Sequence, residues 1–160
     1  MTELVVRPVT PQDIELICRQ RVEMFSDAGR PDDLLQQMAP VFRDWLEPRL
    51  IDGRYFGFIA ELAGRAVGGV GLIELDWPPH PLHPTEGRRG YVLNVFVEED
   101  CRGLGIARQL MAVSEDAFSR RGLTFMALHA TEKGRILYDR MGWSPSAEMT
   151  KPINLKGDLP

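Results

Sequence analysis

The sequence has 160 residues, of which 44% are hydrophobic, 26% charged and 8% aromatic, and its formal net charge is −4. This length and apolar content predict a single domain over residues 1–160 with a buried core, and they exclude a disordered chain. No apolar run approaches the ~20 residues that a membrane helix needs, and the acidic balance disfavours nucleic-acid binding. Two cysteines are too few for a disulfide framework, so we expect a cytoplasmic protein. Taken together, these features favour a domain that handles a small molecule.

The first half of the chain predicts a strand, two helices and a hairpin. Residues 4–7 form a β-branched run typical of a strand. Thr10 is a suitable cap for the helix that follows, and apolar side chains then recur every three or four positions over residues 14–25 and 34–45. Residues 55–75 are typical of an antiparallel hairpin with its turn at Ala63 and Gly64.

Residues 76–90 predict a long irregular loop, because four prolines fall between positions 78 and 84 and proline forbids regular strand pairing. A long loop inside a small domain is more often functional than idle.

The second half alternates strands and helices. We expect strands over residues 91–97 and 123–129, helices over 106–118 and 135–141, and a final strand pair through Trp143 and 148–155. The whole pattern predicts an α/β (α+β) fold with a central mixed β-sheet, antiparallel at the front, with a crossover unit at the back and helices on its faces.

The turn between residues 97 and 106 carries the strongest chemical signal. Gly103 and Gly105 let the backbone approach a ligand, and the following helix start leaves unpaired N–H groups with partial positive charge. This predicts an anion site for a phosphate or pyrophosphate, with Arg102 adding charge at its rim. A tight turn that needs glycine for geometry alone is the alternative. The turn matches neither the P-loop nor the full dinucleotide-binding fingerprint.

The motif Arg-x-x-Gly-x-Ala from Arg102 to Ala107 resembles the Gln/Arg-x-x-Gly-x-Gly/Ala loop of the GNAT superfamily of N-acetyltransferases. Residues 91–97 with the acidic run 98–100 are similar to the central strand of that family. Tyr138, Gly142 and Trp143 occupy the places of its later Tyr…Gly-aromatic segment. The resemblance is specific over residues 91–143, and Ala107 departs from the more usual glycine.

The resemblance implies that acetyl-CoA lies across an opening between the strands at 91–97 and 123–129. Strand backbone would bind the pantetheine arm, and the glycine turn would hold the pyrophosphate. The implied acetyl-CoA-binding residues are Val95, Phe96 and Val97, then Arg102, Gly103, Leu104, Gly105, Ile106 and Ala107, and finally Thr131, Lys133 and Gly134. Thr131 stands where the family often has Ser or Asn, and a solvated helix start is the alternative for Thr131 and Lys133.

The activity implied is acetyl transfer by direct attack of a primary amine, on a small molecule or a peptide, on the thioester. Tyr138 is the implied acid that protonates the departing thiolate. Gly134 lies four residues before Tyr138, so its missing side chain is expected to leave room for a ligand on that helix face. An ordinary half-buried tyrosine is the alternative.

The acceptor side carries no motif. Glu74, Asp76, His80 and His83 precede the central strand and are candidates for acceptor binding or for the general base; a solvated loop residue is the alternative for each. Asn94 is an unexpected amide in an apolar strand, so it needs a partner in the substrate or in the sheet backbone. His129 lies at the end of an expected strand, where a purely structural role is one interpretation.

Several further expectations concern partners. The acidic excess and four aromatic residues of the first half, Tyr55, Phe56, Phe58 and Trp77, suit a cationic, partly apolar amine.

The histidines and cysteines lack paired ligand spacing, so no metal site is predicted. We expect no nucleic-acid or membrane partner, and a homodimer is an open possibility. Two alternatives to an acetyltransferase are a non-catalytic acyl-CoA-binding module and a domain whose glycine turn is purely structural.

Overall fold

A computed structural model of the chain describes residues 3–153. The elements in chain order are β1 (Leu4–Pro8), the 3₁₀ turn η1 (Pro11–Asp13), α1 (Ile14–Asp27), α2 (Asp32–Asp52), β2 (Tyr55–Leu62), β3 (Arg65–Asp76), β4 (Arg88–Val97), the 3₁₀ turn η2 (Glu99–Cys101), α3 (Ile106–Arg120), β5 (Met126–Leu128) and α4 (Glu132–Arg140).

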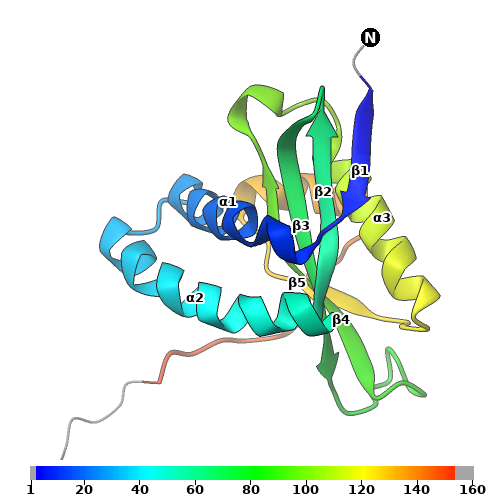
Figure 1. Cartoon of the computed structure of the whole chain (residues 1–160). Coiled ribbons are helices and arrows are strands. Elements are labelled where there is room, and N and C mark those ends of the chain that lie inside the picture. The colour runs from blue at the N-terminus through cyan, green and yellow to red at the C-terminus, as the bar shows by residue number, and fades with distance from the viewer. Residues whose placement is uncertain (1–2, 154–160) are drawn as a thin grey trace, which may run out of the picture.

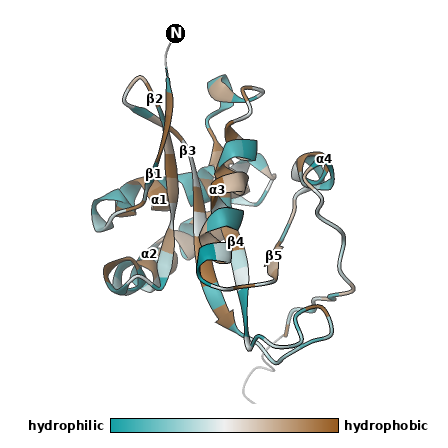
Figure 2. Cartoon of the chain, turned by 90° about the vertical axis from the view of Figure 1, so that its right-hand side faces the viewer, coloured by the Kyte–Doolittle hydropathy of each residue, from teal (hydrophilic) through white to brown (hydrophobic). Residues whose placement is uncertain are grey.

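The described strands form one sheet in the order β1-β2-β3-β4-β5. Strands β1 to β4 are antiparallel to their neighbours, whereas β5 lies parallel to β4 after the crossover through α3. Helices α1 and α2 cover one face of the sheet and α3 covers the other (Figure 1). The view turned by 90° shows α4 beyond β5, on the far side from α1 and α2 (Figure 2). The predicted mixed sheet is therefore confirmed.

Each face of the sheet has its own apolar cluster. On the α3 face, Leu72 and Val92 of the sheet pack with Leu110 of α3, and all three are at most 2% exposed. On the α1/α2 face, Leu46 of α2 packs near Tyr55 of β2, and both are buried. Alternating strand residues supply the two clusters, because successive side chains point to opposite faces.

The glycines of β3 make room for groups from the α1/α2 face. A Cβ at Gly71 would lie 2.1 Å from the Tyr55 hydroxyl oxygen, and one at Gly69 would lie 2.3 Å from the Gln20 side-chain oxygen. Both positions therefore need glycine for close approach. Gly71 in particular lets the Tyr55 hydroxyl reach across β3 toward β4.

The structure corrects three expected boundaries. Strand β5 spans only Met126–Leu128 rather than residues 123–129, and Leu123 is instead buried in the α3-side cluster. Helix α4 begins at Glu132, three residues early, because the Thr131 hydroxyl caps it by accepting a hydrogen bond from the Gly134 amide (3.1 Å). Strand β4 begins at Arg88, opposite Asp76, so the irregular loop is shorter than expected.

The expected final strand pair is wrong for the described residues. Residues 143–153 contain no strand and are mostly exposed, while positions 154 and 155 of the second expected strand lie outside the described range. A strand here would need an edge to pair with, and the neighbouring β5 offers only three residues. Pro145 and Pro152 also each remove a backbone donor from this segment.

Candidate active site

A bulge in β4 sets the geometry of the site. Gly69 of β3 pairs with Phe96 and Gly71 pairs with Leu93, so Asn94 and Val95 together lie opposite the one residue between these glycines. Asn94 has the left-handed φ of +56°, which asparagine tolerates better than most residues. Leu93 and Asn94 both contact residues of the α1/α2 face, whereas Val95 packs on the α3 face.

The parallel strands β4 and β5 separate just before this bulge. Their register covers only Gly90, Tyr91 and Val92 of β4, opposite Met126, Ala127 and Leu128 of β5. Within the described residues, β4 continues from position 93 to 97 with no strand paired on its β5 side. This leaves backbone polar groups of β4 available to a ligand that enters between the strands. Val95, Phe96 and Val97 lie on this unpaired stretch.

The glycine turn ends in a helix start with free amides. Gly103 and Gly105 have φ of +80° and +79°, and a Cβ at either would meet nothing within 4 Å, so the need for glycine is torsional. In the described chain, no amide from residues 103–108 donates to a backbone carbonyl, and the first bond of α3 runs from Gln109 N to Gly105 O (3.1 Å). This stretch also holds Leu104, Ile106 and Ala107. Such an array of amides attracts an anion.

Arg102 connects the glycine turn to β4 and to α1. Its Nε donates to the Val97 carbonyl (3.1 Å), and its Nη2 pairs with Asp27 at the end of α1 (2.5 Å). The side chain remains 47% exposed. The expected positive charge at the rim is therefore present, but it is shared with a carboxylate, and the side chain also holds the turn in place.

Tyr138 is buried on α4, and its surroundings differ from the expectation. The side chain is 8% exposed and packs on Trp143, with ring centroids 5.9 Å apart, and burial raises the pKa of its hydroxyl. A Cβ at Gly134 would lie 3.1 Å from the Tyr138 ring and 3.3 Å from the Thr131 hydroxyl. The space beside Gly134 is thus filled by these two side chains, and the expected room for a ligand there is wrong. Lys133 is exposed at the helix start.

A cavity of about 600 Å³ opens on the α1/α2 side of the bulge. Its β-sheet wall consists of Ile73, Tyr91 and Leu93, and Arg21 of α1 closes one side. Its α2 wall consists of Leu34, Gln37, Met38, Val41, Phe42 and Trp45. We call this space the acceptor cavity. Apolar walls with a few polar groups are typical of small-molecule sites.

Asn94 joins the acceptor cavity to the bulge. Its Nδ2 donates to the Tyr55 hydroxyl (3.0 Å), and its Oδ1 accepts from Nη1 of Arg21 (2.6 Å). The partners of this buried amide are therefore two side chains, rather than the substrate or the sheet backbone. Sequence reasoning missed Arg21 as a site residue, although its place on the apolar stripe of α1 was the available signal, because a charge there is unexpected.

Glu74 and Asp76 do not lie at the acceptor cavity. Ile73 lines the cavity, so Glu74 points to the other face of the sheet, where it pairs with Arg88 (2.9 Å) and Arg121 (3.2 Å). Asp76 is exposed at the end of β3. The charged residues that the sequence suggested for the acceptor are thus separated from it by the sheet.

The three histidines also separate into two groups. His83 is 2% exposed and packs on Phe125 (ring centroids 5.1 Å apart), and His80 stacks on His83 within the proline-rich loop. His129 instead contacts the hydroxyl of Tyr91 through its Nδ1, and Tyr91 lines the acceptor cavity. Of these side chains, His129 is the one that the structure brings beside the site.

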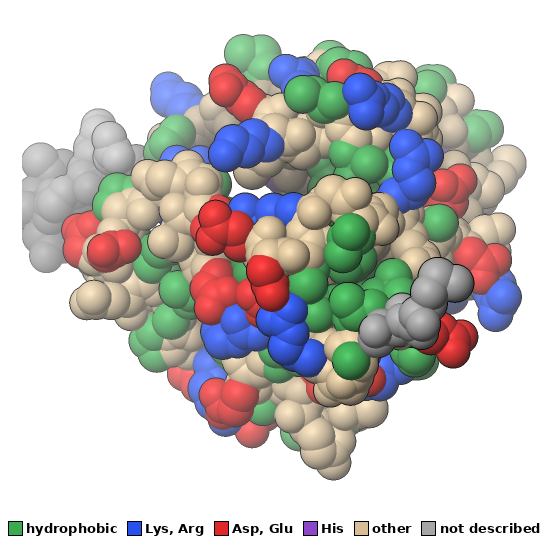
Figure 3. Space-filling view, turned by 90° about the horizontal axis from the view of Figure 1, so that it is seen from above, with side chains coloured by type: hydrophobic (Ala, Val, Ile, Leu, Met, Phe, Trp, Pro, Cys, Tyr) green, Lys and Arg blue, Asp and Glu red, His purple; other side chains and the backbone are tan. Residues whose placement is uncertain are grey.

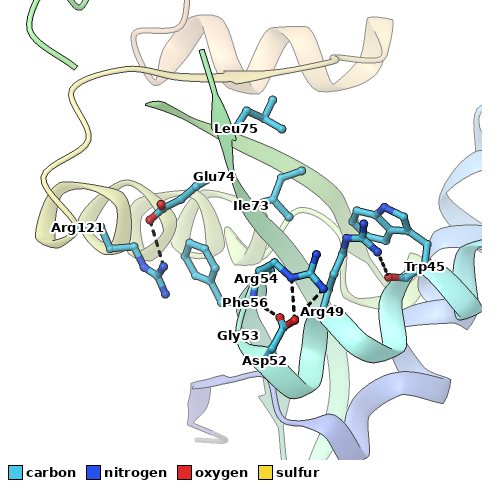
Figure 4. A pocket seen from close by; sticks show the side chains of 10 residues that line it. All are labelled: Trp45, Arg49, Asp52, Gly53, Arg54, Phe56, Ile73, Glu74, Leu75 and Arg121. Atoms are coloured by element: carbon cyan, nitrogen blue, oxygen red, sulfur yellow. Dashed lines mark hydrogen bonds and ion pairs between the residues drawn. The ribbon is translucent and has the colours of Figure 1, made fainter. Parts of the chain in front are cut away.

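A second cavity, of about 520 Å³, lies at the opposite end of β3 from the glycine turn (Figure 4). Its charged groups are occupied by one another: Arg54 pairs with Asp52 (2.7 Å) and Arg121 with Glu74 (3.2 Å). Arg49 donates to the Trp45 carbonyl (2.7 Å). Four of the five charged side chains that line this cavity thus pair with one another, and Arg49 is bonded to a backbone carbonyl, so its charged groups are already engaged.

Other features of the described residues bear on the class of ligand. Residues 3–153 contain no cluster of three metal-ligating side chains, and no helix there is both long and apolar enough to cross a membrane. On the face seen from above, acidic and basic side chains are interspersed and do not gather by sign (Figure 3).

Comparison with known proteins places these observations in a family. The acetyltransferase (GNAT) family matches residues 17–143. The comparison with curated proteins finds no match.

Three solved structures illustrate the similarity. A GCN5-related N-acetyltransferase from Ralstonia eutropha JMP134 is 50% identical, with a TM-score of 0.93 over 94% of this chain and 99% of that one. A predicted acetyltransferase with acetyl-CoA from Clostridium acetobutylicum is 24% identical, with a TM-score of 0.80 over 94% and 96%. An aminoglycoside N-acetyltransferase in complex with CoA is 18% identical, with a TM-score of 0.70 over 96% of each chain. The last two support the fold alone.

Proposed function

Since this chain belongs to the GNAT acetyltransferase family, for which an acetyl-CoA-dependent acyl transfer is implied, we propose that it is an N-acetyltransferase of small primary amines. The observation that carries the proposal is that the bulge of β4 separates two sites of different chemistry. Free backbone groups and helix amides lie on one side, and the acceptor cavity lies on the other.

The backbone groups on the β5 and α3 side of the bulge suit the chemical groups of acetyl-CoA. The stretch of Val95, Phe96 and Val97 has no strand on its β5 side, so its free backbone groups can bond the amides of a pantetheine arm, as an additional strand would. The Val97 carbonyl is not among these groups, because it accepts from Arg102. The amides of residues 103–108 suit a pyrophosphate. Bound there, acetyl-CoA supplies an activated thioester, so the chain needs no covalent nucleophile of its own. The same β4 amides can stabilise the oxyanion that forms on attack, and such a donor contributes about 3–4 kcal/mol.

The acceptor cavity and Tyr138 supply the remaining functions. A neutral amine in the cavity attacks the thioester carbonyl, the new C–N bond forms, and the C–S bond breaks. Burial raises the pKa of the Tyr138 hydroxyl, so this group is protonated at neutral pH and can give its proton to the departing sulfur. The nitrogen of the new amide loses one proton, which returns to the Tyr138 oxygen through water and restores the acid. An amino group on a peptide can react in the same way, but a cavity of about 600 Å³ has the volume typical of small-molecule sites.

Two measurements test this function. Calorimetric titration with CoA should give micromolar affinity, since only a domain with a purely structural glycine turn would fail to bind it. Thiol release from acetyl-CoA in the presence of an amine panel should then exceed the rate without amine. Tight CoA binding with no amine-dependent release would instead establish the non-catalytic acyl-CoA-binding module.

A further inference from the structure

The acceptor cavity contains one charged group, and that group is positive. Arg21 is partly buried on α1, where its guanidinium carbon lies 4.9 Å from the centre of the Phe25 ring and 4.5 Å from that of Phe42. In the part of the chain that the structure describes, no carboxylate lies within ion-pair distance of it. It donates to Asn94, and the hydroxyls of Tyr55 and Tyr91 are close enough to affect its charge.

The hydrogen-bonding capacity of Arg21 is also only partly used. Nη1 donates to Asn94 (2.6 Å), while Nε is buried with no partner among the described residues. A buried donor without a partner is costly, and a partly desolvated charge without a counter-charge is more so. Most other arginines that are held in the fold are paired, such as Arg7 with Asp13 and Arg88 with Glu74. Arg21 is held in place by aromatic rings and an amide, with its charge left for another group.

The rest of the acceptor cavity is apolar. Met38, Phe42 and Trp45 line it from α2, and Leu34 and Val41 remain 54% and 67% exposed beside it. Exposed apolar side chains grouped at a cavity mark a binding surface. The occupant should therefore combine an apolar part with a group that complements an arginine.

We propose that the natural acceptor is an amine that also carries a carboxylate and an apolar side chain, of the kind found in an apolar amino acid, and that Arg21 binds the carboxylate. Guanidinium and carboxylate groups match in charge and in planar geometry. The same positive charge repels amines that carry only further positive charge. The expectation of a cationic acceptor is thereby replaced. This inference rests on the proposed acetyltransferase function and names its substrate class.

Matched acceptors test it directly. The probes are L-phenylalanine, L-phenylalanine amide and 2-phenylethylamine, with L-leucine and its amide as a second pair. For at least one pair, kcat/KM of the wild-type protein for the acid should exceed that for its amide about tenfold or more. Amide or phenylethylamine turnover equal to that of the acids would overturn the proposal. The amide carries the less protonated amine at neutral pH, so intrinsic reactivity works against the expected result.

Variants of Arg21 assign the preference to this side chain. Arg21→Gln should bring the acid-to-amide ratio close to one, and Arg21→Lys should keep part of the preference because it keeps the charge. Arg43→Gln is the matched control, because Arg43 pairs with Glu15 of α1 and does not line the acceptor cavity, and it should leave the ratio unchanged. Unchanged CoA affinity in Arg21→Gln shows that the variant is folded. A preference that survives in Arg21→Gln would contradict the assignment.

A binding measurement separates this inference from the proposed activity. 3-Phenylpropionate has the carboxylate and the ring but no amine, so it reports on the cavity even if no amine is acetylated. Chemical-shift titration should show saturable binding to the wild type that Arg21→Gln weakens about tenfold or more. Absence of binding to the wild type would overturn the inference, whereas failure of acetyl transfer with this binding intact would count against the proposed function alone.

Discussion

The two sides of the β4 bulge recognise their ligands by different means. On the β5 and α3 side, the groups available are backbone amides and carbonyls of residues 93–108. On the α1/α2 side, they are side chains from four elements, among them Arg21, Met38 and Tyr91. The first arrangement depends on φ angles and strand pairing, and the second depends on which side chains the fold brings together.

This difference determines how each side tolerates substitution. A backbone site is damaged mainly by residues that cannot adopt its torsion angles, so Gly105 matters more than its exposed neighbour Leu104. A side-chain site is damaged by losing one functional group while the backbone stays in place. The predictions below test the two sides separately.

Gly105→Val should have the largest effect on the backbone site. A left-handed residue with a Cβ is strained by about 1–2 kcal/mol, and a β-branched residue by more. The turn should therefore rearrange and misdirect the amides of residues 103–108. We expect CoA affinity to fall at least ~1,000-fold, or roughly 4 kcal/mol, as measured by calorimetry.

Gly122→Val is the matched control for this variant. Gly122 follows the other end of α3, has the same φ of +79°, and has the same open space around its Cβ position. Its replacement should lower the free energy of unfolding by as much as Gly105→Val does, at least about 1–2 kcal/mol, with CoA affinity retained. Equal CoA affinity in both variants would mean that the glycine turn does not bind the pyrophosphate.

Tyr138→Phe should have the next largest effect, on turnover rather than on binding. Removing a general acid typically lowers the rate by 10²–10⁴, so we expect kcat to fall roughly 100-fold with CoA affinity nearly unchanged. Because burial raises the pKa of this hydroxyl, the wild-type acid stays protonated up to a higher pH than a free tyrosine. Thiol release should be followed from pH 6 to 10. Turnover that matches the wild type throughout would show that Tyr138 is not the acid.

The backbone side could largely be predicted from the sequence. Gly103 and Gly105 fall at fixed offsets between an apolar strand and an amphipathic helix, and local torsion requirements of this kind leave a local pattern. The crossover unit and the hairpin likewise depend on contiguous signals, and both are present in the structure. Strand ends were less predictable, because the length of β5 depends on where β4 turns away rather than on its own residues.

The side-chain site could not be predicted in the same way. Arg21, Asn94 and Tyr55 come together only because α1, β4 and β2 pack on one another, and no spacing in the sequence records that packing. Asn94 was conspicuous as an amide in an apolar strand, but its partners were not readable. Glu74 is a candidate for acceptor binding by its position before the central strand, yet strand alternation places it on the other face.

Asn94→Ala should destabilise the side-chain site and the fold moderately. It leaves the buried Tyr55 hydroxyl without its amide partner and frees Arg21, at a cost of roughly 1–3 kcal/mol in the free energy of unfolding. The KM for the acceptor should rise, while CoA affinity stays nearly constant. Asn94→Gly keeps the left-handed φ accessible, so it should be less destabilised than Asn94→Ala in urea unfolding. The reverse order would show that the φ of this residue costs nothing.

Asp13→Asn should have the smallest effect, confined to stability on the α1 side. Asp13 accepts hydrogen bonds from Arg7 (2.9 Å to each oxygen) and from the Thr10 amide (2.7 Å) at the start of α1. The Arg7 guanidinium holds the pKa of Asp13 below its usual range, so folding favours the charged form. That stabilisation is complete above the usual carboxyl pKa and is lost as the pH falls through the lowered one.

Wild type should therefore exceed Asp13→Asn by about 1 kcal/mol in free energy of unfolding at pH 7, a value reduced by the partial exposure of Arg7. The difference should shrink steadily as urea unfolding is repeated below about pH 4. A difference that stays constant down to pH 2 would show that it arises from packing rather than from the ion pair. CoA affinity should be the same in both proteins at pH 7, because the free amides of the glycine turn make no use of the α1 start.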